Sequence, residues 1–167
     1  MKTYDKYKDS GIEWIGDIPE HWTIEKGKRL FNFVNGYPFD SKKFSNVIEG
    51  LPIVRIRDIQ KHSSKTYWQG EIVKEAIIDT NDILIGMDGD FNISIWKGGT
   101  ALLNQRVCKI YGVKKYDDKF LFYLLPFSLK VINDLITQLL NICLIMIFGM
   151  RIFLIRHFPN KPPLPII

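Results

Sequence analysis

The sequence predicts an α+β domain with a mixed, twisted β-sheet, long loops, an N-terminal helix and a C-terminal helical segment. Short apolar or alternating runs fill the middle of the chain, separated by Gly, Asp, Asn or Ser, as is typical of strands and turns. No helical pattern recurs at regular intervals between them, so an array of strand–helix–strand units fits less well. The 167 residues, 46% hydrophobic and 25% charged, suffice for one globular core.

The first 22 residues are expected to form an arm. Its start, up to Ser10, is polar and lacks the apolar core of a signal peptide, so we expect an intracellular, cytoplasmic protein. In GIEWIGDIPEHW, Trp14 and Trp22 bracket a turn, and buried indoles of this kind can pin an extended segment onto a domain.

Residues 23–137 are expected to form the domain. In Thr23–Val34, apolar side chains at helical spacing with basic residues opposite predict a short amphipathic helix, which an Asn-Gly pair ends. Five runs predict strands: Leu51–Ile56, Tyr67–Val73, Asp82–Met87, Ile93–Trp96 and Arg106–Tyr111. Asp117–Thr137 then shows a helical apolar pattern, interrupted at Pro126.

The stretch Leu84–Lys109 combines two apolar runs with an acidic glycine turn, a Trp-Lys-Gly-Gly turn and an Asn-Gln-Arg cluster. It contains no nucleophile–base pair, and the chain has no phosphate-binding glycine loop or hydrolase serine motif. Cys108 and Cys143 sit in apolar settings that favour buried thiols, and the three histidines lack the spacing of zinc ligands. These features favour reading a partner over transforming a substrate, and we infer that the partner is duplex DNA.

The formal net charge of +5 gives limited support for DNA binding. The last thirty residues hold three basic residues and no acid, so residues 1–137 carry 20 basic and 18 acidic residues. Because the balance of that part is only +2, local patches would have to supply the attraction to phosphates.

Three candidate DNA contacts lie in the loop NGYPFDSKKF. Tyr37, Lys42 and Lys43 could place an aromatic ring and two cations at a groove, with the lysines on phosphates. The alternative is an ordinary surface loop with Phe39 and Phe44 tucked into the core.

An arginine pair forms the second candidate. Arg55 and Arg57, in VRIRDI, lie two residues apart on a predicted strand and would project on the same face. Such a pair makes a fork for phosphate or guanine. Alternatively, Asp58 or a neighbouring glutamate pairs with one of the arginines.

Two aspartates, Asp88 and Asp90, flank Gly89 in a third candidate. A metal-dependent nuclease could use them to hold magnesium, but the glutamate of a calcium loop is missing, and a turn closed by Asp and Gly fits better. In such a turn, carboxylates such as that of Asp90 could accept hydrogen bonds from cytosine amino groups.

The last candidates surround a flexible glycine turn. Trp96 and Lys97 would present an indole and an ammonium group beside it, and Asn104, Gln105 and Arg106 follow. Amides pair with adenine and guanidinium with guanine in the commonest base contacts. Alternatively, the amides cap strand ends and Arg106 pairs with an acid.

Together these motifs resemble the specificity subunit of Type I restriction–modification systems. The resemblance begins with YKDSGIEWIGDIPEHW and continues through FVNGYPFDSKKF, GLPIVRIRDI, NDILIGMDGDF and ALLNQRVCKI, covering Tyr7 to Thr137. It implies an α+β target-recognition domain that reads half of a split DNA sequence. The loops around Tyr37, Arg55, Arg57, Asp90 and Trp96–Gly99 then become groove contacts.

The resemblance also implies partners. A full subunit carries two such domains, each followed by a long helix, and the paired helices hold methyltransferase subunits in a complex with a restriction subunit. S-adenosylmethionine, ATP and magnesium would be bound by those partners, so this chain is expected to be a non-catalytic binding subunit without a cofactor.

The tail, residues 138–167, departs from the family. Leu139–Ile155 is a mostly apolar run of 17 residues that could anchor a small membrane-associated protein, although Arg151 inside it is costly. A frameshift near Thr137 fits better, because the codons from Gln138 onward, read from their third base, can encode TVKHLS, which the family has at this place. The chain would then be truncated and its tail out of frame; sequencing the gene tests this.

Overall fold

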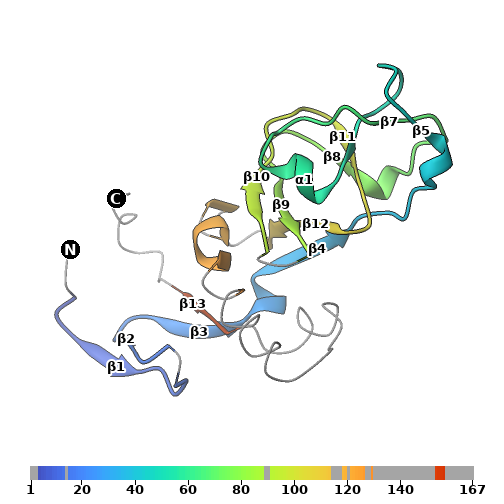
Figure 1. The fold of residues 1–167 in the computed structure, drawn as a ribbon. Coiled ribbons are helices and arrows are strands. Elements are labelled where there is room, and N and C mark those ends of the chain that lie inside the picture. Colours follow the sequence, from blue (N-terminus) through green and yellow to red (C-terminus); the bar gives the residue numbers. More distant parts are fainter. Residues whose placement is uncertain are drawn as a thin grey trace.

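The computed structural model describes residues 4–13, 15–88, 91–113, 118–119, 121–126, 129 and 153–156. They form an α+β fold, as predicted, in which short strands dominate. A small hairpin lies at one end of the chain trace, and a larger body holds the strands and helical turns between β4 and β12 (Figure 1).

The arm is a β-hairpin. Strand β1 (Tyr7–Asp9) pairs antiparallel with β2 (Asp17–Pro19). The ring of Tyr4 packs against His21 and Trp22, with centroids 5.3 and 6.1 Å apart. Trp14, the other predicted anchor, lies outside the described residues.

The predicted helix over Thr23–Val34 is wrong. That segment forms β3 (Thr23–Lys26), a 3-10 turn η1 (Gly27–Arg29) and β4 (Phe31–Asn35). Gly27 weakens any helix by about 1 kcal/mol, and β4 instead pairs with β12 along its whole length. Phe31 and Phe33 then project to the same face of the sheet and pack in one core, so the alternation, not the helical spacing, decides the structure.

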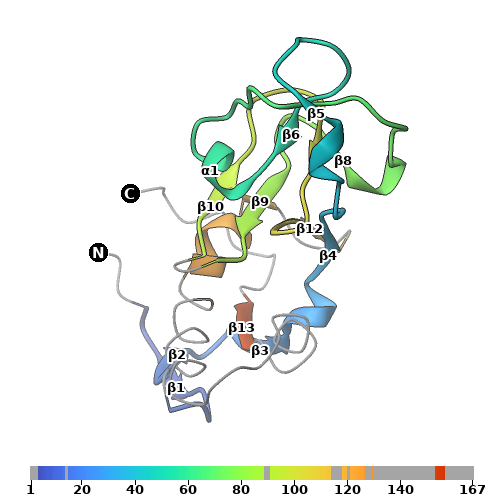
Figure 2. The ribbon, with the colours of Figure 1, turned by 45° about the vertical axis from the view of Figure 1, so that its right-hand side comes forward.

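A four-stranded sheet in the order β10-β9-β12-β4 forms the centre of the body (Figures 1 and 2). Its strands β9 (Ile83–Gly86), β10 (Ile93–Ile95) and β12 (Val107–Gly112) confirm the three strands predicted in this part of the chain. All neighbours in this sheet are antiparallel. β9 is buried on both faces, which explains its continuous apolar run.

A second, three-stranded sheet in the order β6-β11-β8 packs against the first. Its strands are β6 (Ile53–Val54), β8 (Ile77–Ile78) and β11 (Ala101–Leu103), and β6 and β11 run parallel. The predicted strand over Leu51–Ile56 is therefore short, because helix α1 (Ile56–Ile59) begins at its end. The 3-10 turn η3 (Lys74–Ala76) precedes β8.

Two further strand pairs complete the described structure. β5 (Phe44–Ser45) pairs with β7 (Tyr67–Trp68), after the 3-10 turn η2 (Ser41–Lys43), so only the start of the strand predicted over Tyr67–Val73 forms. In the tail, the backbone of β13 (Phe153–Arg156) pairs with β3. The rest of residues 138–167 lies outside the described part, so the frameshift stays a prediction.

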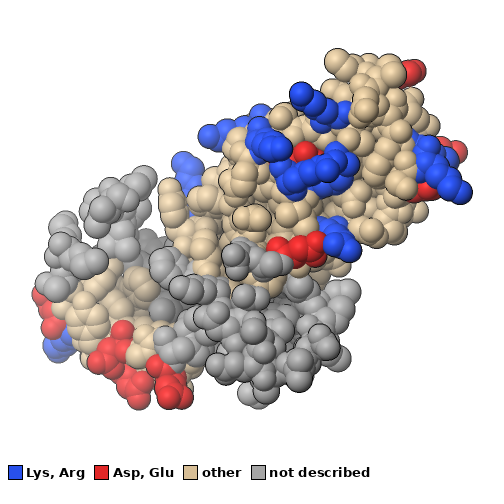
Figure 3. Space-filling model, viewed as in Figure 1, with Lys and Arg blue, Asp and Glu red and all other residues tan. Residues whose placement is uncertain are grey.

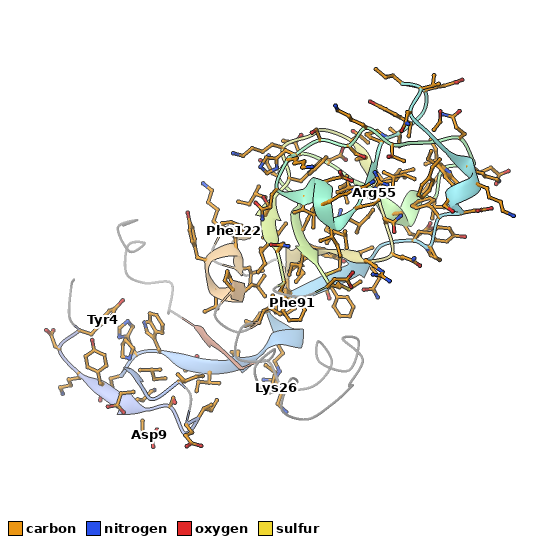
Figure 4. All side chains as sticks on the ribbon, in the orientation of Figure 1. Tyr4, Asp9, Lys26, Arg55, Phe91 and Phe122 are labelled. Carbon is orange, nitrogen blue, oxygen red and sulfur yellow. The ribbon has the colours of Figure 1, made fainter. Side chains whose placement is uncertain are left out.

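The four-stranded sheet separates two apolar cores. On one face, Ile83 and Ile85 of β9 pack with Leu121, Leu125 and Leu129, which lie on the helical residues 118–119, 121–126 and 129. This confirms the start of the predicted C-terminal helical segment, but Pro126, where an interruption was predicted, is itself helical. Residues 130–137 lie outside the described part. Phe91 and Phe122 border this core (Figure 4).

On the other face, Leu84 packs with α1 and the second sheet, through Ile59, Trp96 and Leu103. α1 sits directly on β9, because a Cβ on Gly86 would lie only 3.1 Å from the Ile56 side chain. A third core lies beyond the second sheet, around Trp68. Within the described ranges, no helix is both long and apolar enough to cross a membrane.

Candidate nucleic-acid interface

Arg55 is a structural residue. Its Nε and backbone N–H both donate to Oδ2 of Asp58, at 3.3 and 3.1 Å, and its Nη2 donates to Oγ1 of Thr66 at 2.6 Å. The bond from the Arg55 backbone N–H to the Asp58 carboxylate is part of a capping box. It marks the point where β6 has ended and α1 begins. The prediction that Arg55 and Arg57 share a strand face is therefore wrong, and the alternative pairing of an arginine with Asp58 is confirmed. Figure 4 shows Arg55 within the body.

A basic surface surrounds α1. We define the α1 surface by four exposed residues: Arg57, Lys61, Lys65 and Lys97. None of the four has an ion-pair partner within the described ranges. Figure 3 shows Lys and Arg side chains gathered over the part of the body that holds α1.

Three acidic side chains of the body are engaged by partners other than these four cations. Asp58 is buried, 6% exposed, against Arg55. Asp82 accepts a hydrogen bond from Lys109 at 3.1 Å, and Asp79 accepts one from Thr100. Since the four cations have no ion-pair partner within the described residues, they produce a local positive potential that the nearly neutral composition conceals.

The opposite charge gathers on the arm. Five exposed acidic residues belong to this hairpin and its turn: Asp5, Asp9, Glu13, Asp17 and Glu20. Figure 3 shows Asp and Glu side chains over the end formed by β1 and β2. A polyanion would be repelled from this end and attracted to α1.

Trp96 does not face a groove. It is 1% exposed, packs in the core beneath α1, and donates its Nε1–H to the carbonyl of Gly99 at 2.6 Å. The prediction of Trp96 as a DNA contact is wrong, because the indole gains more from burial than any exposed position offers. Its burial brings the following turn to α1 and leaves Lys97 exposed at the surface.

A second polar cluster lies at one end of the four-stranded sheet. There β4 ends, β12 begins and β9 ends, since Asn35 and Ile85 both lie opposite Cys108. We call Tyr37, Asp88, Gln105 and Arg106 the strand-end cluster; all but Asp88 were predicted site residues. Tyr37 is 45% exposed, and Gln105 and Arg106 are exposed beside it.

Glycine makes this cluster possible. Gly36 donates its N–H to the carbonyl of Val107, and Tyr37 donates to Leu103. A Cβ on Gly36 would overlap the backbone of Asn104, so only glycine allows Tyr37 to reach the turn before β12. Arg106 pairs with Asp88 at 2.7 Å, which confirms the alternative that it meets an acid.

Lys42 and Lys43 belong to neither cluster. They lie exposed on η2, beside β5 and β7. Nζ of Lys43 lies 5.8 Å from the ring centroid of Trp68, and Phe39 and Phe44 pack in the third core. The structure therefore places both lysines at a separate part of the body from α1 (Figures 1 and 2).

Sequence reasoning missed Lys61, Lys65 and the partner role of Asp88. The sequence feature that could have indicated the two lysines is the basic loop KHSSK, which follows α1. Asp90 lies outside the described residues, so its predicted contact is not tested. Among described residues, no group of three His, Cys, Asp or Glu side chains could hold a metal ion.

Cys108 is a buried thiol, as predicted. Burial raises the pKa of its thiol to about 12, so the neutral form persists at physiological pH. Cys143 lies outside the described residues.

Solved structures share this fold. The chain superposes on the HsdS subunit from Thermoanaerobacter tengcongensis with a TM-score of 0.53 and 11% identity, covering 70% of this chain and 29% of that one. A structure titled for the complex assembly and conformational transition of the Type I R-M system gives a TM-score of 0.53 at 12% identity, over 65% and 28% of the two chains. The fold is thus the α+β fold of Type I specificity subunits.

Sequence comparison gives the family. Residues 19–142 match the family model described as the Type I restriction modification DNA specificity domain. The specificity subunit of the Type I restriction enzyme EcoBI from Escherichia coli is 39% identical over 126 residues, which cover 75% of this chain and 27% of that protein. The chain belongs to the Type I DNA specificity domain family, and it spans about a quarter of this relative's length.

Proposed function

We propose that this chain recognises one half of a split sequence in duplex DNA, as a specificity domain of a Type I restriction–modification complex. The observation that carries the proposal is the α1 surface, where four exposed cations have no acidic partner within the described residues. Phosphates are the partner that such a group attracts most strongly. Membership of the family supports DNA as their source.

The two clusters suit different tasks. Lys and Arg of the α1 surface would contact phosphates and fix the orientation of the domain, which carries no sequence information. The strand-end cluster offers an aromatic ring, an amide and a guanidinium group, which are side chains that test base edges. Sequence preference would therefore depend on Tyr37, Gln105 and Arg106, and general affinity on α1.

The proposed role assigns no chemistry to this chain. Methylation and cleavage would belong to modification and restriction subunits, which would bind S-adenosylmethionine, ATP and magnesium. The relative from Escherichia coli is named as a specificity subunit of a restriction enzyme, which supports such an assembly. The substrate, cellular DNA, would place the complex in the cytoplasm.

The test measures the binding of fluorescent duplexes to the full chain at several salt concentrations. The variant K61Q/K65Q/K97Q should bind more weakly, and its log–log salt slope should be shallower by about 0.9 for each lost phosphate contact. The matched control is K6Q/K8Q, which removes exposed lysines from the arm. Equal affinities and slopes for the wild type and the α1 variant would contradict the proposal.

A further inference from the structure

The guanidinium group of Arg106 is hydrogen-bonded through one nitrogen, Nη1, and its opposite edge is exposed. Its Nη1 donates to Oδ2 of Asp88 at 2.7 Å. Within the described residues, its Nε and Nη2 donate to no other group, and the side chain is 68% exposed. The Nε–Nη2 edge is one of the two forks with which a guanidinium group can grip two acceptors at once.

Arg55 shows the opposite arrangement within the same body. Its Nε donates to Asp58 and its Nη2 to Thr66, so the equivalent edge is filled by the protein. It is also less exposed, at 26% of the side chain against 68% for Arg106. Of these two arginines, only Arg106 keeps its Nε–Nη2 edge open within the described residues.

The backbone fixes the geometry of the pair. Arg106 directly precedes Val107, which lies opposite Gly86 in the β12–β9 ladder, and Asp88 follows Gly86 by two residues. The N–H of Met87 donates to the carbonyl of Arg106 at 2.9 Å, which ties the two strand ends together. Asp88 and Arg106 are thus held side by side by main-chain bonds, although both side chains are exposed.

We propose that Arg106 reads a guanine through its Nε–Nη2 edge, and that Asp88 is the positioning residue that turns this edge outward. The inference rests on the proposed function, since it requires duplex DNA at the strand-end cluster. Guanine fits because its O6 and N7 are the paired acceptors that an arginine fork matches in the major groove. A carboxylate at this place also repels phosphates, so Asp88 lowers affinity for DNA of any sequence while it sharpens the preference.

The test selects duplexes from a randomised pool with the full chain and then measures binding of the variants R106K and D88N. Lysine keeps the charge and lacks the fork, so R106K should lose the preference for guanine at one position, with about ten-fold or more loss of discrimination. D88N should relax the same position and bind unselected duplexes more tightly than the wild type. This opposite sign distinguishes positioning from a merely structural role.

The matched control is R29Q. Arg29 has the same 68% exposure and also pairs with a carboxylate, that of Glu25 at 3.3 Å, but it lies on η1 outside both clusters. R29Q should leave the selected sequence unchanged. Exposed ion pairs contribute little to stability, so all three variants should fold, and thermal melting checks this.

The outcomes separate the two proposals. A wild-type chain that selects no sequence and binds no duplex overturns the proposed function itself. A wild type that selects a sequence, with R106K and D88N selecting the same one, overturns only the role of Arg106 and Asp88. Equal loss of affinity for every duplex in R106K also overturns it, because that result shows no role of Arg106 in reading a base.

Discussion

The carbonyl oxygen of His62 occupies the space that a side chain on Gly98 would need. A Cβ on Gly98 would lie 2.3 Å from that oxygen and 2.3 Å from Cζ2 of Trp96. The loop after α1 and the turn after β10 therefore touch through main chain and indole alone. Through this contact, the turn that carries Lys97 lies next to the loop that carries Lys61 and Lys65.

G98A tests that contact. The added methyl group must displace the His62 loop or the Trp96 ring, and overpacking of this kind costs about 1–3 kcal/mol. We expect a lower free energy of unfolding in urea together with weaker DNA binding, because the α1 surface loses its shape. K97A, at the neighbouring exposed position, should weaken binding and leave the unfolding midpoint unchanged. A G98A protein as stable as the wild type would contradict this packing.

R55Q and R57Q should separate stability from binding. R55Q leaves the buried carboxylate of Asp58 without its cation, and loss of such a partner costs about 1–3 kcal/mol. R57Q removes an exposed charge and should lower only the affinity for DNA. Urea unfolding and duplex titration on both variants check the prediction, and the reverse pattern would show that the two arginines have exchanged roles.

W96A should unfold the body, not relax its sequence preference. Removal of a buried tryptophan side chain costs about 3–5 kcal/mol. W96F keeps most of the apolar contact but loses the bond from Nε1 to Gly99, so it should cost about 1 kcal/mol. Thermal melting measures both. Stable W96A with altered DNA selectivity would restore the idea of an exposed groove contact.

The raised pKa of the buried Cys108 thiol predicts that the protein loses stability at high pH. The thiol ionises near pH 9 when unfolded and near pH 12 when folded, so the folded protein keeps a proton that the unfolded chain releases. Stability present below pH 9 should therefore fall as the pH rises towards 12, by up to about 1.4 kcal/mol per pH unit.

The measurement compares urea unfolding from pH 8 to pH 10.5 for C143A and C108A/C143A. Tyrosines and lysines titrate in both proteins, so only the difference between the slopes reports Cys108. The free energy of unfolding should fall less steeply with pH in C108A/C143A than in C143A, whatever the stability of the double variant at pH 8. Parallel curves would show that Cys108 ionises equally in both states.

The fold could be predicted where one face or both faces of an element are buried. β9 and β12 are such strands, and their apolar patterns gave nearly correct bounds. Thr23–Val34 failed because its apolar residues fit two periods, and only the pairing of β4 with β12, far along the chain, selects one. The strand expected over Leu51–Ile56 forms only as the short β6 for a local reason, since Asp58 caps helix α1, which begins at Ile56.

The candidate site was predicted in its residue types and only partly in its arrangement. Tyr37, Gln105 and Arg106 are exposed at one sheet end, which the sequence alone could not show because their segments are far apart. Arg55 and Trp96 have side chains typical of DNA contacts, but Arg55 is held by Asp58 and Thr66, and Trp96 is buried in the core beneath α1. Composition indicates such residues, whereas burial decides their role.

Lysine reactivity in the presence of DNA tests the central claim most directly, that duplex DNA lies against the α1 surface. The full chain is acetylated with and without duplex DNA, and mass spectrometry measures the modification of each lysine. We predict that Lys61, Lys65 and Lys97 are protected by DNA, while Lys6 and Lys8 on the arm react equally in both samples. Unchanged reactivity around α1, or protection confined to the arm, would contradict the account.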